Sequence, residues 1–162
     1  MVTQDRLKDI LLYDEDTGVF TWRIQRGQMK VGSVAGSIYD RGYIRIRIDG
    51  TRYLAHRLAW LYSTGSFPSD YMDHIDRDPS NNRLCNLRPA TAKQNQGNRK
   101  INHNNTSGFK GVSWCKKALK WVVFINLSGK NTRLGCYEDK DEAAIIYRNA
   151  AIKEHGEYAL NV

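Results

Sequence analysis

The sequence has few cysteines and none in a Cys-x-x-Cys spacing. Cys85, Cys115 and Cys136 are an odd number, so a disulfide framework or a zinc ribbon is not expected. Residues 1–18 contain no apolar run long enough for a secretory signal or a membrane span. We therefore expect reduced thiols in a cytoplasmic protein that is not secreted and has no membrane partner.

Acidic residues are missing from a long central stretch. No Asp or Glu occurs from residue 79 to 137, where eleven of the 25 Lys and Arg residues lie. All 17 acidic residues lie outside this stretch, so the net charge of +8 is concentrated in it. A basic surface can serve solubility alone, but a stretch this long favours a polyanion contacted mainly through phosphates.

The composition and the hydrophobic pattern predict a globular α+β fold. The chain of 162 residues is 41% hydrophobic and 26% charged, which excludes disorder and allows one ordinary domain or two small ones. We expect a β-rich N-terminal region with these elements: helices at residues 4–12 and about 56–63, and strands at 19–22, 33–38, 43–48 and 51–55. In the strand at 43–48, isoleucines alternate with Tyr43, Arg45 and Arg47, so one face enters a core and the other presents cations.

The residues that indicate chemistry begin at Asp73-His74. Asn86 follows twelve positions after the histidine, and Asn95 lies nine further on. Asp73 offers an oxygen ligand for a divalent ion, and His74 suits a general base because its ordinary pKa lies near the working pH. An amide oxygen of Asn86 can accept from His74 Nδ1–H, and Asn95 can complete the metal site. Two protein ligands suffice for Mg²⁺, which keeps several waters.

Each of these residues also has a simpler interpretation. An isolated Asp-His dipeptide is usually a turn or a capped helix, and Asn81 and Asn82 are most simply turn residues. His56, beside Arg57 at a helix start, is expected to pack or to contact a phosphate rather than to catalyse. His103 and His155 are expected to have no chemical role.

The segments AHRLAWLY and DHIDRDPSNNRLCNLRPATAKQNQGN resemble the HNH endonucleases of phages and mobile introns, over about residues 55–98. This resemblance implies a ββα-metal motif of two short strands and a helix around one divalent ion, Mg²⁺ or Mn²⁺. By matching position, Asp73 and Asn95 would be metal ligands, His74 the general base and Asn86 the residue that orients it. Many HNH proteins have histidine where this chain has Asn95.

The tail carries its charge asymmetrically. Residues 108–133 contain six basic and no acidic residues, whereas residues 134–162 contain more acidic than basic ones. We expect a three-stranded sheet facing a polyanion, with a helix at about 140–154 facing solvent. Segments such as Phe109-Lys110-Gly111-Val112 and Glu142-Ala143-Ala144 resemble the AP2/ERF DNA-binding domain, in which a three-stranded antiparallel sheet enters the major groove. That resemblance implies DNA contacts by Lys110, Ser113, Trp114, Trp121, Phe124, Asn126 and Arg133.

Lys116 and Lys117 lie in a turn where phosphate contact is expected, and Arg88 is a further candidate DNA contact. Ser113, Phe124 and Asn126 replace residues that are usually Arg or Glu in AP2/ERF domains, so the preferred sequence of that family does not carry over. Core packing is the alternative for Trp114 and Trp121.

Together these features predict a phage-encoded, metal-dependent DNA endonuclease of the homing type. We expect an HNH nuclease domain at residues 1–101 with its ββα core at about 70–98, a linker at 102–107, and an AP2/ERF-like domain at 108–162. The second strand of the ββα core is expected at residues 84–88. One site per chain predicts a nicking enzyme, a monomer or weak dimer with no small-molecule cofactor, acting on double-stranded DNA in the bacterial host. The alternatives are a DNA-binding regulator without catalysis and an RNA-processing enzyme.

Overall fold

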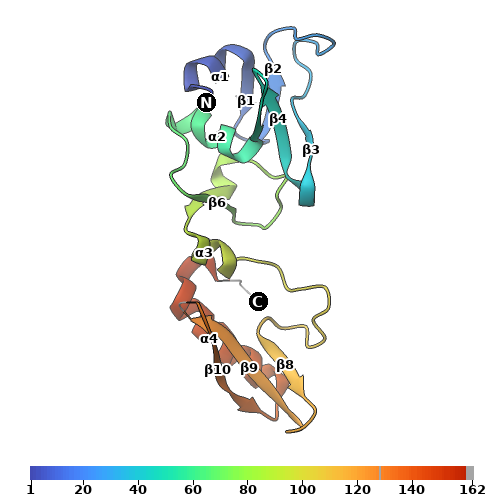
Figure 1. Ribbon diagram of the computed structural model, residues 1–162, viewed down its shortest axis with the longest axis vertical. Helices are drawn as coiled ribbons and strands as arrows, with labels where there is room; N and C mark the ends of the chain where they lie inside the picture. The colour runs from blue at the N-terminus through green and yellow to red at the C-terminus, as the bar shows by residue number, and fades with distance from the viewer. Residues whose placement is uncertain (128, 160–162) are drawn as a thin grey trace. The chain divides into compact units, whose positions relative to one another are not determined.

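The computed structural model describes residues 1–127 and 129–159, and it divides into two compact units, Met1–Thr91 and Ala92–Val162. Figure 1 shows small sheets and short helices in both units, which is a mixed α/β architecture. No helix within the described ranges is long and apolar enough to cross a membrane.

The first unit begins with α1 (Gln4–Ile10), followed by the hairpin of β1 (Leu11–Asp14) and β2 (Val19–Trp22). The helix begins at a side-chain cap, where Thr3 Oγ1 accepts from the Arg6 amide at 3.3 Å. It ends two residues earlier than predicted because Leu11 already pairs with Trp22 in the hairpin. The strand β1 was missed in the sequence, since its apolar residues continue the helical spacing.

A three-stranded antiparallel sheet follows, made of β3 (Ser37–Ile38), β4 (Ile44–Ile48) and β5 (Thr51–Leu54). The predicted alternation in β4 is present, since Ile46 and Ile48 are buried and Arg47 is exposed. The predicted strand at 33–38 is reduced to its last two residues. Gly36 has φ +102, a conformation outside the β region, and this interrupts the strand.

The helix α2 (Ala55–Thr64) continues directly from β5 and ends at Gly65, whose φ of 84 closes the helix in the left-handed conformation. It leads to the antiparallel pair β6 (Tyr71–His74) and β7 (Leu87–Ala90). The second strand was predicted at 84–88. It begins at residue 87 because Leu84–Asn86 form a 3₁₀ turn, η2.

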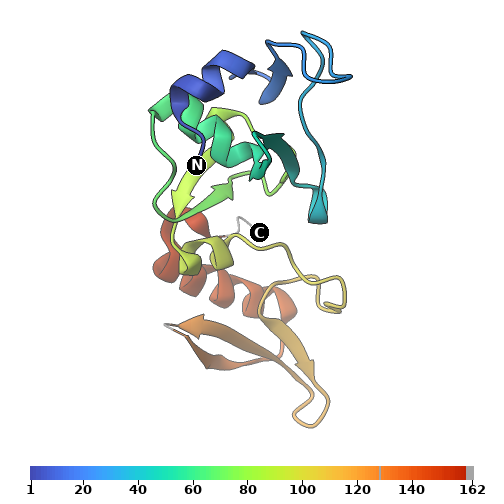
Figure 2. The same cartoon turned by 45° about the horizontal axis from the view of Figure 1, so that its top comes forward.

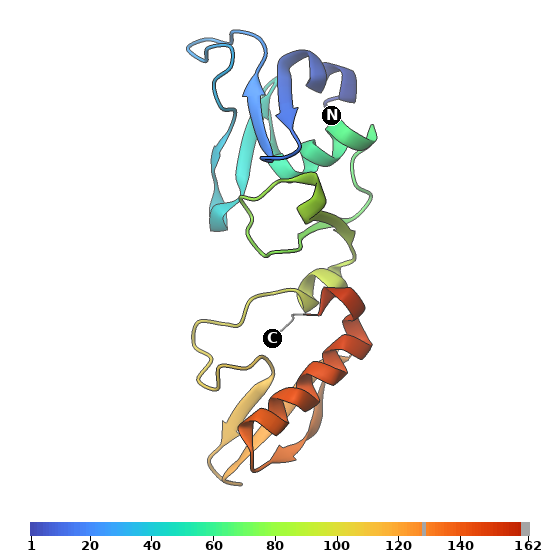
Figure 3. The ribbon, with the colours of Figure 1, turned by 180° about the vertical axis from the view of Figure 1, so that it is seen from behind.

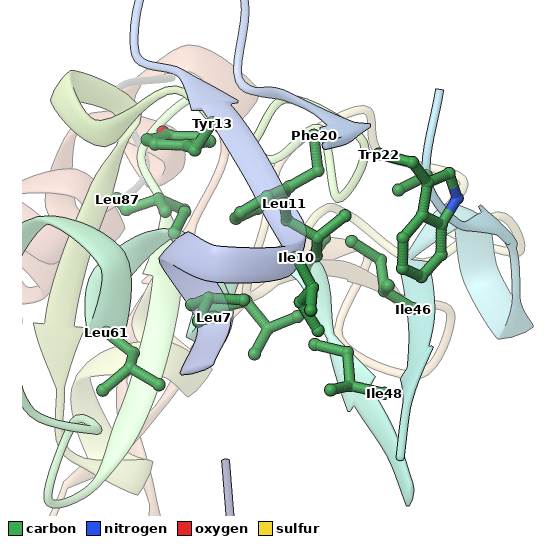
Figure 4. Close-up of a cluster of buried hydrophobic side chains, with 14 of the residues drawn as sticks. Leu7, Ile10, Leu11, Tyr13, Phe20, Trp22, Ile46, Ile48, Leu61 and Leu87 are labelled. Carbon is green, nitrogen blue, oxygen red and sulfur yellow. The ribbon is translucent and has the colours of Figure 1, made fainter. Parts of the chain in front are cut away.

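One hydrophobic core holds these elements of the first unit together. In Figure 4, side chains from α1, β1, β2, β4, α2 and β7 converge in one cluster. Leu7, Leu11, Ile46 and Leu58 are fully buried in it. Burial of this kind contributes about 25 cal/mol for each Å² of apolar surface removed from water. Because β7 enters the core through Leu87, the core fixes the strand pair that carries Asp73 and His74.

The second unit consists of α3 (Ala92–Gly97), the antiparallel sheet of β8 (Val112–Cys115), β9 (Lys120–Leu127) and β10 (Lys130–Tyr137), the helix α4 (Lys140–His155), and a final 3₁₀ turn, η3 (Gly156–Tyr158). Asp139 caps α4, with Oδ1 accepting from the Glu142 amide at 2.7 Å. Figures 2 and 3 show α4 lying along one face of this sheet, which it contacts through all three strands. The predicted sheet and helix are therefore present.

The predicted linker at 102–107 lies inside the second unit as a hydrogen-bonded loop. Ser107 Oγ donates to the Val112 carbonyl at 2.7 Å, and Asn105 Nδ2 donates to that of Phe109 at 2.9 Å. The compact units divide ten residues before the predicted end of the nuclease domain, since α3 packs on α4. Gly97 allows this contact, because a Cβ there would lie 2.8 Å from His155. The functional domain bounds themselves remain a prediction.

Candidate functional site

The residues with candidate chemistry in the first unit lie at the end of β6. The register of the β6–β7 pair places Asp73 opposite Arg88 and His74 opposite Leu87. Both Asp73 and His74 are buried, at 4% and 5% exposure. A buried carboxylate and a buried imidazole at adjacent positions need polar partners, since an unpaired polar group in the interior is costly. The structure supplies a partner for each.

Asp73 is paired with Arg88 on the neighbouring strand. Its Oδ2 accepts from Arg88 Nε at 2.9 Å and lies 2.8 Å from Arg88 Nη2. The two side chains are only 5% and 14% exposed, respectively. Arg88 was predicted to contact DNA. In the structure its guanidinium lies on Asp73, because the strand register puts the two side chains opposite each other, and DNA contact by Arg88 remains a prediction.

His74 contacts an amide that the sequence analysis assigned to a turn. The Nε2 atom of His74 lies 3.3 Å from Oδ1 of Asn82, which is 2% exposed. The Asn82 amide is oriented by its Nδ2, which donates to the Ser80 carbonyl at 3.1 Å. An amide oxygen only accepts, so Nε2 carries the proton and a neutral His74 has its lone pair on Nδ1. The sequence analysis expected the opposite arrangement, with Nδ1–H donating to Asn86.

The protonation state of His74 suits a proton acceptor. Burial lowers the pKa of His74 below its ordinary value, and the hydrogen bond to Asn82 and the charges of Asp76 and Asp73 oppose this shift. A lowered pKa keeps the imidazole neutral at physiological pH. The neutral ring is the form that a general base requires.

The side chain of Asn86 hydrogen bonds within the loop that follows β6. Its Oδ1 accepts from the Asp76 amide at 3.0 Å, and its Nδ2 donates to Asp76 Oδ1 at 2.9 Å and to the Asn81 carbonyl at 2.8 Å. These bonds tie together the loop between β6 and η2, which also carries Asn82. Asn82 is the residue whose amide oxygen lies near His74 Nε2, and the role of Asn86 in orienting His74 remains a prediction.

Contacts from the β1–β2 hairpin also stabilise the loop between β6 and η2. The Tyr13 hydroxyl donates to the Asn82 carbonyl at 2.7 Å in a buried hydrogen bond. Gly18, with φ +74, lies so close beneath the loop that a Cβ there would be 2.5 Å from the Arg83 amide nitrogen. These contacts join residues more than 60 positions apart, and no sequence signal identifies them.

Replacing Asn82 with alanine is expected to slow any reaction in which His74 accepts a proton, by roughly tenfold. Without the amide oxygen, the His74 ring loses the hydrogen bond that sets its tautomer and its direction. The measurement is the initial rate of plasmid nicking, compared with the exposed Asn104→Ala variant as a control. Equal rates for the two variants would show that Asn82 does not orient the ring.

Two further rings surround His74. The His56 ring, from α2, has its centroid 5.1 Å away at an interplanar angle of 85°. The Tyr43 ring, which precedes β4, lies 5.9 Å from His74 and 5.5 Å from His56. His56 was expected to pack or to contact a phosphate, and it is buried at 5% exposure. The sequence offered no signal that these rings meet, since they come from three separate elements.

The fourth residue of the predicted constellation, Asn95, lies on α3 in the second unit and is half-buried. Its role as a metal ligand with Asp73 remains a prediction. The chemistry of Asp73 fits a divalent ion, since carboxylate oxygen is the ligand that Mg²⁺ prefers. No group of three or more His, Cys, Asp or Glu side chains that could hold a metal occurs among residues 1–127 and 129–159.

The predicted DNA contacts in the second unit lie on both faces of its sheet. Strand register pairs Ser113 with Val122 and Arg133 with Phe124, on the face away from α4. Trp114 pairs with Trp121, which packs against the core under α4, and the two rings lie edge to face at 5.0 Å. Trp114 is still 42% exposed. For Trp121, core packing describes its position.

The polar candidates in this unit have several local partners. Lys110 Nζ donates to the carbonyls of Gly97 and Arg99 at 2.7 and 3.2 Å, so it stabilises the C-terminal end of α3. Asn126 Oδ1 accepts from the Gly129 amide at 2.9 Å, and Arg133 contacts the Cys136 thiol. Lys116 and Lys117 are exposed in the turn before β9. Direct DNA contact by these residues remains a prediction.

Comparisons with known proteins give a consistent result for the first unit. Residues 53–96 match a family model described as HNH endonuclease. Protein 3.8 of Escherichia phage T7 is 37% identical over 105 residues, which cover 64% of this chain and 86% of that protein. An uncharacterised HNH endonuclease of Acanthamoeba polyphaga mimivirus is 36% identical over 106 residues, covering 64% of this chain and 54% of that protein.

Among solved structures, a similar chain is described as "DNA binding and cleavage by the HNH homing endonuclease I-HmuI". The TM-score is 0.41 and the sequence identity 22%, over 91% of this chain and 78% of that chain. The match to the HNH family model includes Asp73, His74, Asn82 and Asn86, and it ends one residue after Asn95.

Proposed function

Since the chain belongs to the family of protein 3.8 from Escherichia phage T7 and carries an HNH endonuclease domain at residues 53–96, we propose that it is a metal-dependent endonuclease that nicks double-stranded DNA. The observation that carries this proposal is the neutral His74 beside Asp73 at the end of β6, with its tautomer set by Asn82. A carboxylate next to a proton-accepting imidazole is the combination that phosphodiester hydrolysis requires.

In the proposed reaction, His74 Nδ1 takes a proton from a water molecule whose oxygen attacks the phosphorus. The bond from phosphorus to the 3′ oxygen breaks, and that oxygen takes up a proton. The products carry 5′-phosphate and 3′-hydroxyl ends. Asn82 and the loop tied by Asn86 keep His74 aimed throughout.

HNH nucleases generally use a divalent metal ion, and in this chain Asp73 and Asn95 are the residues that would hold it. When bound, the ion supplies charge that stabilises the departing oxygen and the phosphate. Arg88 pairs with Asp73, since its guanidinium lies on Oδ2 of that carboxylate. A buried carboxylate needs such a partner for its charge.

The acid-free stretch supports DNA as the substrate. Residues 79–137 contain eleven Lys and Arg residues and no carboxylate, and they run from the loop that follows β6 to the last strand of the second unit's sheet. Contacts of such a surface go mainly to phosphates and weaken with salt. We propose that the AP2/ERF-like second unit contributes the sequence preference, with Ser113, Asn126 and Arg133 on its outer face and Lys116 and Lys117 on phosphates.

Nicking of supercoiled plasmid tests this function. With Mg²⁺ or Mn²⁺ the full chain is expected to convert supercoiled into open circular DNA, because one site per chain cuts one strand. With EDTA, cleavage is expected to fall to background while a gel shift persists at low salt. Sequencing the ends of the products reports the site, the strand and the end chemistry together.

Two outcomes would point to another function. Binding without nicking in either metal would indicate a DNA-binding regulator that retains the HNH fold as a scaffold. Stronger competition by structured RNA than by duplex DNA would indicate an RNA-processing enzyme.

A further inference from the structure

A second buried histidine lies beside His74 and has no role in the reaction described above. His56 is the second residue of α2, and its ring meets that of His74 edge to face with centroids 5.1 Å apart. Both histidines are 5% exposed, and their rings lie in the same buried cluster.

His56 is held in the neutral form. Burial, together with smaller effects of the nearby His74 and Arg57, lowers the pKa of His56 to about 3. The position of His56 in the first turn of α2 acts in the same direction, because the amino end of a helix disfavours a cation. A neutral imidazole has one nitrogen that donates and one that accepts.

One nitrogen of this ring is unsatisfied. His56 Nδ1 is buried and finds no hydrogen-bond partner among residues 1–127 and 129–159. Buried polar atoms of native proteins are almost always paired, and an exception requires an explanation such as a ligand that arrives later. If packing were the only role, an apolar side chain would serve without the cost of an unpaired nitrogen.

We propose that His56 is a further residue of the nuclease site, and that its Nδ1 hydrogen bonds an oxygen brought by the reaction, either of the scissile phosphate or of the attacking water. The spacing of the rings supports this assignment. The two rings meet edge to face with centroids 5.1 Å apart, so a group that reaches His74 lies next to the His56 ring. This inference rests on the proposed nuclease function.

Three substitutions at residue 56 distinguish the contribution of the Nδ1 nitrogen from the contribution of ring packing. His56→Phe keeps a ring and removes both nitrogens. His56→Asn places a polar atom near the position of Nδ1, whereas His56→Gln places one near Nε2. We expect His56→Phe to lower kcat for plasmid nicking by roughly 10- to 100-fold, as the loss of one hydrogen bond to the reacting group does, and His56→Asn to recover more of the rate than His56→Gln.

The melting temperature separates function from packing. We expect His56→Phe to melt no lower than the wild type, because the substitution removes the unpaired nitrogen, so the rate falls while stability does not. His103→Phe, at an exposed histidine of the second unit, is the control and is expected to cleave normally. All rates are measured well below the lowest melting temperature of the set.

The affinity for DNA, measured without catalysis, distinguishes an oxygen of the phosphate from the oxygen of the attacking water. In EDTA, weaker DNA binding by His56→Phe would indicate a phosphate oxygen, and unchanged binding would indicate the water. The inference is overturned if His56→Phe cleaves at the wild-type rate. It is also overturned if His56→Asn cleaves no faster than His56→Phe. Both outcomes count whatever the melting temperatures of the variants are. If the wild type itself cleaves no DNA, it is the proposed function that fails.

Discussion

His74→Ala is expected to lower the rate of plasmid nicking by about 10²- to 10⁴-fold, the usual contribution of a general base. The reason is that Nδ1 of His74 holds the lone pair that takes the proton, since Nε2 is occupied by Asn82 at 3.3 Å. Alanine removes both nitrogens and leaves no other proton acceptor at that position. The initial rate with Mg²⁺ on supercoiled plasmid is the measurement.

The variant also needs a binding control, because His74 is buried and its removal leaves a cavity. A gel shift in EDTA is expected to show DNA binding within a few fold of the wild type. His103→Ala, the same substitution at an exposed position, is expected to cleave normally. Cleavage by His74→Ala at the wild-type rate would exclude His74 as the base.

Gly18→Ala is expected to damage the fold and the site together. Residue 18 has φ +74, where an L side chain is strained, and its Cβ would lie 2.5 Å from the Arg83 amide nitrogen and 2.6 Å from the Asn82 carbonyl carbon. Both are backbone atoms, so the loop must move. We expect the free energy of unfolding to fall by about 3 kcal/mol, from the strained backbone and the overlap combined.

The same substitution is expected to slow nicking by about tenfold or more, because moving the loop moves Asn82 away from His74. Gly32→Ala is the matched control. Gly32 has φ +80 with no atom within 4 Å of the added Cβ, so only the backbone cost of about 1 kcal/mol applies. Equal losses of stability in the two variants would show that the contact beneath the loop is unimportant. Chemical denaturation and nicking rates measure the two effects.

Much of the secondary structure followed from the sequence, because its signals are local. The alternation of Ile44, Ile46 and Ile48 with arginines predicted β4, and the helix expected at about 140–154 corresponds to α4. The predicted strand bounds were wrong where a turn or a glycine interrupts an apolar pattern. The 3₁₀ turn Leu84–Asn86 displaced the start of β7, and Gly36 interrupted β3.

The candidate residues Asp73, His74, Asn86 and Asn95 were identified from residue type and spacing alone, since the chemistry of phosphodiester cleavage restricts which side chains can serve. The basic stretch at 79–137 likewise predicted a polyanion partner, because net charge is a property of composition. Sequence by itself therefore determined the class of chemistry, and it predicted the residues that can perform it.

Only the tertiary structure decided which side chains of the site contact one another. The β6–β7 register placed Arg88 on Asp73, and a shift by one residue would have turned it to the other face. The loop between these strands brought Asn82 to His74 in place of Asn86, and so decided which ring nitrogen accepts the proton. The packing of α2 brought His56 beside them. Such contacts depend on register and on close packing between elements distant in sequence, and residue spacing does not specify either.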